Sequence, residues 1–140
     1  RFLSTTSTNK SLFVKGNMTI GPTGLVSKDN ASGASVDTLF ISRIFENTGN
    51  ASRGVDFHPT TTRKLRLEFV GTESSFIRGE GNYSYLGTFR VNKADSIYNL
   101  HNESESFSNR FTTSVLSIPS VDFVLDAGMY YHNNPSNITL

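Results

Sequence analysis

Tyrosine and asparagine side chains gather at two places in the sequence, and their chemistry suits contact with a sugar. Tyr83 and Tyr85 alternate along one predicted strand, and a second group near the C-terminus comprises Tyr130, Tyr131, His132, Asn133 and Asn134. Flat aromatic faces pack against the C–H faces of sugars, while amides supply paired donors and acceptors for hydroxyl groups. We interpret both groups as candidate glycan-binding residues. The alternative is that the Tyr rings are buried and close the edge of a β-sheet core.

One basic cluster stands out, formed by Arg63, Lys64 and Arg66. Arg66 falls on the polar face of a predicted strand that begins at this cluster. Guanidinium and ammonium groups can contact the acidic group of a sugar or a phosphate. The alternative is a solvated strand whose charges protect a sheet edge from pairing with another chain.

The glycosylation pattern Asn-x-Ser/Thr occurs seven times, more often than the roughly three matches expected by chance for this composition. The acceptor residues are Asn9, Asn17, Asn30, Asn50, Asn82, Asn102 and Asn137. One interpretation is a glycan-coated extracellular protein. The other is that turns enrich Asn, Ser and Thr together, so that such patterns arise without being modified.

The sequence shows no catalytic signature, and we expect no enzymatic activity, no cofactor and no metal. The three histidines, His58, His101 and His132, have no ligand-like spacing, and there is no cysteine to serve as a nucleophile, metal ligand or disulfide partner. Glu103 and Glu105 would share a strand face but lie among Ser and Asn, as in a solvated loop. A carbohydrate-active enzyme domain is therefore the least favoured alternative.

Composition restricts the partners further. The formal net charge of the 140 residues is +1, which gives no electrostatic reason to expect nucleic acid as a partner. No apolar run approaches the roughly 18 residues that a spanning helix needs, so we expect no membrane insertion. Ser, Thr and Asn together make up a third of the chain.

Apolar residues alternate with polar ones along most of the sequence, which predicts β-strands. Examples are Leu65–Phe69 and Val121–Leu125, while Leu39–Phe45 is continuously apolar enough for a strand buried on both faces. These runs recur every 8 to 15 residues or so, with turn-forming residues between them. The pattern predicts an all-β fold, an antiparallel β-sandwich or a jelly-roll-like domain.

The N-terminal quarter differs in character. Residues 1–34 are poor in aromatic residues and rich in turns, and Lys15-Gly16-Asn17 has the form of a hairpin turn. Such a segment buries too little surface to order alone. We therefore predict an extended, shaft-like or strand-donating segment over residues 1–34, followed by a β-sandwich domain over residues 35–140.

The segment from Ser11 to Gly21, with its Val14-Lys15-Gly16-Asn17 and Ile20-Gly21, resembles repeat units of bacteriophage tail fibres and other trimeric viral fibres. Ile44 to Ser52 has a similar character. The resemblance covers about 40 residues. It implies a structural protein in which three chains wind around one axis, with a globular β domain at the tip.

Together these observations favour a structural and adhesive protein of a viral or phage fibre. We expect it to be extracellular or part of a virion, homotrimeric, and in contact with a host-surface glycan or receptor. The alternative is a subunit of an extracellular β filament, like a pilus, in which the first 34 residues donate a strand to the next subunit.

Overall fold

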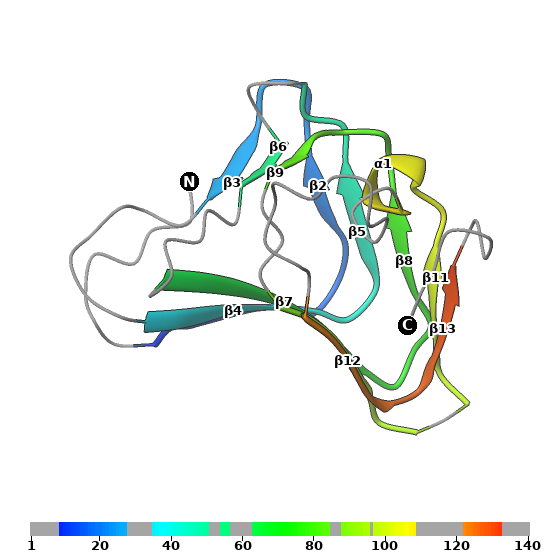
Figure 1. Cartoon of the computed structure of the whole chain (residues 1–140). Coiled ribbons are helices and arrows are strands. Elements are labelled where there is room, and N and C mark those ends of the chain that lie inside the picture. Colours follow the sequence, from blue (N-terminus) through cyan, green and yellow to red (C-terminus); the bar gives the residue numbers. More distant parts are fainter. Residues whose placement is uncertain are drawn as a thin grey trace.

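The chain is organised as three parallel β-sheets (Figure 1), as seen in a computed structural model that describes residues 9–27, 35–50, 54–56, 63–84, 88–95, 97–108 and 122–132. Sheet A contains, in spatial order, β1 (Ser11–Val14), β4 (Ser35–Ile41), β7 (Arg63–Gly71), β10 (Thr88–Lys93) and β12 (Asp122–Ala127). Sheet B contains β13 (Met129–His132), β11 (Asn99–Asn102), β8 (Ser75–Arg78), β5 (Ile44–Asn47) and β2 (Met18–Ile20). Sheet C contains β3 (Leu25–Ser27), β6 (Gly54–Asp56) and β9 (Tyr83–Ser84).

Each strand pairs with the strand one full circuit later in the chain. In sheet A, Thr38 pairs with Arg66, which in turn pairs with Thr88, and Thr88 pairs with Asp122. Between these pairings the chain leaves sheet A, crosses sheet B and, in the first three circuits, sheet C, before it returns (Figure 1). The fold is therefore a parallel β-solenoid, in which each circuit is a coil stacked on the one before it.

The prediction of an antiparallel β-sandwich or jelly roll was wrong in its architecture, although the all-β character holds. All pairings between the described strands are parallel. Alternation of apolar and polar residues reports that one face of a strand is buried, but it does not report the partner or its direction. The short spacing between runs, which suggested hairpins, is the spacing between successive sides of one coil.

The predicted hairpin at Lys15-Gly16-Asn17 is instead a corner. β1 lies in sheet A and β2 in sheet B, so the two strands flanking the turn do not pair with each other. The apolar run from Leu39 to Phe45 is likewise divided by a corner at Ser42 and Arg43, between β4 and β5. Residues 11–27 supply β1 to β3, the first coil, which pairs with β4 to β6.

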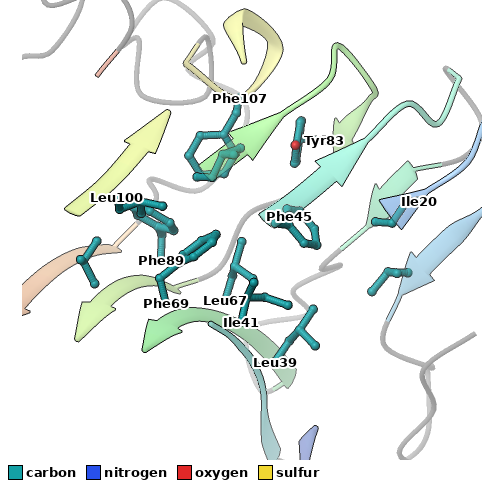
Figure 2. Packing of buried hydrophobic residues seen from close by; sticks show 13 residues of the cluster. Ile20, Leu39, Ile41, Phe45, Leu67, Phe69, Tyr83, Phe89, Leu100 and Phe107 are labelled. Atoms are coloured by element: carbon teal, nitrogen blue, oxygen red, sulfur yellow. The ribbon is translucent and has the colours of Figure 1, made fainter. Parts of the chain in front are cut away.

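The interior of the coils is filled by apolar side chains in columns, one residue from each coil. Leu39, Leu67 and Phe89 are successive in-register residues of one such column in sheet A. They are buried together with residues of the other sheets, and the rings of Phe69 and Phe89 meet edge to face at 5.8 Å (Figure 2). Burying a large apolar side chain contributes about 1.5–3 kcal/mol, so this core provides the main stabilisation of a chain without disulfides.

A helix takes the place of a sheet C strand in the fourth coil. This short helix, α1 (Glu105–Ser108), begins after Ser104, whose Oγ accepts a hydrogen bond from the Phe107 amide at 3.1 Å. That contact is the N-cap interaction expected of serine. The helix places the Phe107 ring in the core, edge to face with Tyr83 at 5.2 Å (Figure 2).

The corner between sheets A and B contains a buried lysine. Lys93 Nζ donates to the backbone oxygen of Val70 at 2.7 Å, to Ser75 Oγ at 2.6 Å and to the backbone oxygen of Ser42 at 3.3 Å. These acceptors come from two different coils, so the ammonium group links consecutive corners. Burial lowers the pKa of Lys93 to about 8.

The corner between sheets B and C is organised by a buried asparagine. Asn47 Nδ2 donates to the backbone oxygen of Asn82 at 2.8 Å, and Asn47 Oδ1 accepts from the amide of Gly49 at 3.0 Å. Gly79 and Gly81 lie so close to Asn47 that no side chain fits at either position. This asparagine therefore stabilises the turn of its own coil through Gly49, and it sets how closely the next coil packs through Asn82, Gly79 and Gly81.

Candidate functional site

The richest group of hydrogen-bonding side chains lies on the outer face of sheet A, across β7, β10 and β12. Residues at alternate positions of these strands fill the core, so the residues between them face outward. The outward group combines two guanidinium groups, two carboxylates and one amide. We call it the sheet A cluster, and its members are Arg66, Glu68, Arg90, Asn92 and Asp126.

Interactions between neighbouring strands hold the cluster in place. Asn92 Nδ2 donates to Glu68 Oε1 at 3.0 Å, which links β10 to β7. Arg90 Nε forms an ion pair with Asp126, which links β10 to β12. β12 contains a β-bulge at this ion pair. Val91 pairs with Leu125, but the next residue of β10, Asn92, pairs with Ala127, so β12 has one residue more than β10 at this point. Asp126 is the extra residue, and bulges commonly redirect a side chain in this way.

The electrostatics of the cluster favour fixed charges. The hydrogen bond from Arg90 lowers the pKa of Asp126, and the same hydrogen bond raises the pKa of Arg90. Both groups therefore keep their charges through the neutral range, whereas a general acid needs a pKa near the working pH. The arrangement suits recognition of a polar ligand better than proton transfer.

Arg66 is the one member of the predicted basic cluster whose side chain the structure describes, and it lies in this site. Its Nε is buried and has no hydrogen-bond partner among the described residues. Arg63 and Lys64 lie earlier on the same strand, in register with Ser35 and Val36, and their side chains lie outside the described part of the structure. The Nε donor is too buried to reach a ligand, so a contact with an acidic group or a sugar hydroxyl would come from the terminal amino groups of this guanidinium.

Aromatic residues form a separate ladder on the outer face of sheet B. The rings of Phe76 and His101 stack at 5.2 Å and those of His101 and Tyr131 at 4.9 Å, with interplanar angles of 16° and 6°. The Arg78 guanidinium lies 4.6 Å from the centre of the Phe76 ring. Because the rings stack on one another along the solenoid axis, most ring faces contact another ring and are not available to a ligand.

A row of polar side chains lies beside this ladder. Arg78 Nε and Glu103 Oε2 form an ion pair at 2.6 Å, and Thr19 Oγ1 donates to Glu46 Oε2 at 3.2 Å. The Arg78 and Glu103 side chains are each more than 40% exposed, so this ion pair contributes little to stability.

Tyr83 and Tyr131 are the members of the two predicted tyrosine groups whose side chains the structure describes, and they lie in different places. Tyr83 has an exposed fraction of 0%, and its ring belongs to the core, whereas Tyr131 is exposed on sheet B. Tyr130 and His132 belong to β13 and are in register with Leu100 and Asn102. The structure describes the backbone of Tyr130 and His132 but not their side chains. Tyr85, Asn133 and Asn134 lie outside the described residues altogether.

The predicted glycosylation acceptors differ in accessibility. Asn9, Asn17 and Asn50 are exposed, and Asn82 is half-buried. Asn102 is buried, and its Oδ1 accepts a hydrogen bond from the Ser104 amide at 3.1 Å. Asn30 and Asn137 lie outside the described residues. An exposed side chain is the minimum requirement for a glycan, and Asn102 does not meet it.

Sequence reasoning missed Glu68, Arg90, Asn92 and Asp126. The available signal was the polar residue between each pair of apolar ones in the strands around Leu67 and Phe89. That alternation identifies an outward side chain, but only the parallel register shows that residues 68, 90 and 126 lie on neighbouring strands.

In the part of the chain that the structure describes, no group of three or more His, Asp or Glu side chains is arranged to hold a metal ion. The described residues also include no helix of the length and apolar character needed to cross a membrane. A scan against protein-family models and searches of curated proteins and of solved structures each found no match.

Proposed function

We propose that this chain is a structural and adhesive module of an extracellular fibre, of the kind carried by viruses and phages, and that the sheet A cluster binds a host-surface glycan. The observation that carries this proposal is the cluster itself, with donors and acceptors fixed on three neighbouring strands. The solenoid supplies a rigid support, because each coil is hydrogen-bonded to its neighbours along the axis.

The chemistry of the cluster suits a glycan. Sugar hydroxyls need both donors and acceptors, and the cluster offers guanidinium, amide and carboxylate groups side by side. The hydrogen bond from Asn92 to the buried Glu68 and the Arg90–Asp126 ion pair hold Asn92, Arg90 and Asp126 in place before a ligand arrives. Preorganised groups lose less entropy on binding.

The rest of the face adds an apolar surface. Phe40 is in register with Glu68 and stacks on Phe13, with ring centroids 4.2 Å apart. Phe13 is exposed at the end of this row. A ligand that extends along sheet A therefore meets an aromatic surface next to the polar one, the combination that sugars require. The positive charge of the half-buried Arg66 favours a glycan that carries acidic groups.

A glycan array that includes neutral and acidic polysaccharides tests the proposal. For an acidic glycan that binds, we expect Arg66→Gln and Asn92→Ala each to weaken binding by about tenfold, which corresponds to the loss of about 1.4 kcal/mol. Arg43→Gln is the matched control, since Arg43 makes an exposed ion pair with Glu73 at a corner away from the cluster.

Three results would overturn the proposal. These are an array without any bound glycan, equal weakening by Arg43→Gln, and unchanged binding in both cluster variants. If Tyr131→Ala abolishes binding while the cluster variants do not, the binding face is sheet B.

A further inference from the structure

Within the described residues, interior apolar side chains of the first and last coils are partly exposed. One column of core residues in sheet A runs from Val14 through Ile41, Phe69 and Val91 to Leu125. Val91 has an exposed fraction of 0%, whereas Leu125, which follows it in the last coil, is 49% exposed. At the other end, Leu12 is 37% exposed although its in-register neighbour Leu39 is buried. Among the residues that the structure describes, no further coil covers these side chains at either end.

Other exposed apolar and aromatic residues lie on the same first and last coils. Phe13 is 63% exposed and stacks on Phe40 with one face only, as judged from the described residues. In the last coil, Met129 and Tyr131 are also exposed. Solenoids usually end in coils with a polar outer surface, whereas the described residues of both end coils include exposed apolar side chains.

The two ends match in geometry. Sheet A ends in β1 on one side and β12 on the other, and sheet B ends in β2 and β13. Among the described strands, β1 pairs with β4 alone and β12 with β10 alone. Because all described strands are parallel, the free backbone N–H and C=O groups on the outer edge of β12 are spaced to pair with those on the outer edge of β1.

The charges of the two ends are complementary. Residues 9–27, the first coil, include Lys10 and Lys15 and no acidic residue. Residues 122–132, the last coil, include Asp122 and Asp126 and neither Lys nor Arg, and the charge of Asp126 is partly balanced by its ion pair with Arg90 of the preceding coil. Opposite charges favour the approach of one end to the other and disfavour contact between like ends.

We propose that this chain assembles head to tail, with β12 and β13 of one copy pairing in parallel with β1 and β2 of a second copy. If the register of sheet A continues across the contact, Leu125 packs against Val14 of the second copy and the core column becomes continuous. The contact joins two different surfaces and continues the solenoid along its own axis, so each added copy leaves a new free end and the product is an open filament. This inference does not depend on the proposed glycan site, which lies on the outer face of sheet A.

Light scattering over a range of protein concentrations tests the assembly. We expect the mass of the wild-type chain to increase with concentration and to fall as salt screens the charges of the two ends. Leu12→Lys blocks one end and Leu125→Lys blocks the other, and each variant alone is expected to be a monomer. Leu12 and Leu125 are 37% and 49% exposed, so a lysine at either position can cover the neighbouring core residue with its methylene chain and keep its ammonium group in water. Circular dichroism checks that the variants fold.

A mixture of the two variants distinguishes this geometry from any other. Each variant keeps one intact end, and together they are expected to form a one-to-one dimer that grows no further. Ile97→Lys is the matched control, because Ile97 is an exposed apolar residue in the fourth coil, and this variant should assemble like the wild type. A monomer at all concentrations, a defined trimer, or a mixture that stays monomeric would overturn the proposal.

Discussion

Replacing Gly79 with alanine is expected to lower the free energy of unfolding by about 3 kcal/mol. Gly79 follows β8 and has a φ of 81°, a conformation that L-residues with a side chain rarely adopt. A Cβ atom there would overlap the backbone oxygen of Asn47 and lie 2.9 Å from its carbonyl carbon. Both partners are backbone at a stacked corner, so the overlap is relieved only by moving two coils apart. Urea denaturation measures the change.

Gly16→Ala is the control for this prediction. Gly16 also lies at a corner, between β1 and β2, but no atom lies within 4 Å of the position where its Cβ would be. Alanine there should change the unfolding free energy by less than about 0.5 kcal/mol. Similar effects at the two positions would show that the corners are not stacked as the solenoid requires.

Replacing Lys93 with methionine is expected to lower the free energy of unfolding by about 2 kcal/mol at neutral pH. Methionine fills similar space but donates no hydrogen bond, so the backbone oxygen of Val70 and Ser75 Oγ lose the donor that they share. The removal of a buried charge offsets part of this loss. Lys15→Met, at an exposed position, should have little effect.

The same lysine predicts how stability depends on pH. Its pKa is lowered by burial to about 8 in the folded state, against 10.5 when unperturbed. Between these values the unfolded chain binds the proton that the folded chain has lost, so the unfolding free energy rises with pH. Burial also raises the pKa of Tyr83. Above about pH 10, where an unfolded tyrosine ionises, stability should therefore fall again.

Urea denaturation at several pH values between 7 and 11 checks this dependence. The wild type should show increasing stability from pH 8 to about 10, and the increase should be absent in Lys93→Met. A wild-type stability that falls steadily over the same range would mean that Lys93 is not held in a desolvated corner.

The strands were predictable and their partners were not. Leu65, Leu67 and Phe69 alternate in the sequence, and the strand they predict is β7. That alternation does not show that Leu67 packs between Leu39 and Phe89. The partners of a residue in a parallel solenoid lie one whole coil earlier and one whole coil later in the chain, and the alternation does not reveal the length of a coil. The glycine and asparagine corners were recognised as turns, but a turn residue permits a corner between sheets as readily as a hairpin.

The candidate site shows the same limit. Arg66 was identified from the sequence as a possible anion contact. Its neighbours in the sheet A cluster come from two later coils, and Asp126 faces the cluster only because a β-bulge redirects it. Tyr83 was predictable as an aromatic residue on a strand, but which face of the strand enters the core depends on the fold.

The proposed adhesive function depends most directly on which face of the solenoid meets the glycan. Nuclear magnetic resonance of the labelled chain, with and without an acidic glycan identified on the array, measures this at individual residues. We predict that the side-chain signals of Arg66, Arg90 and Asn92 shift on binding, while those of His101 and Tyr131 on sheet B do not. Shifts confined to sheet B, or no shift in the sheet A cluster at saturating glycan, would contradict it.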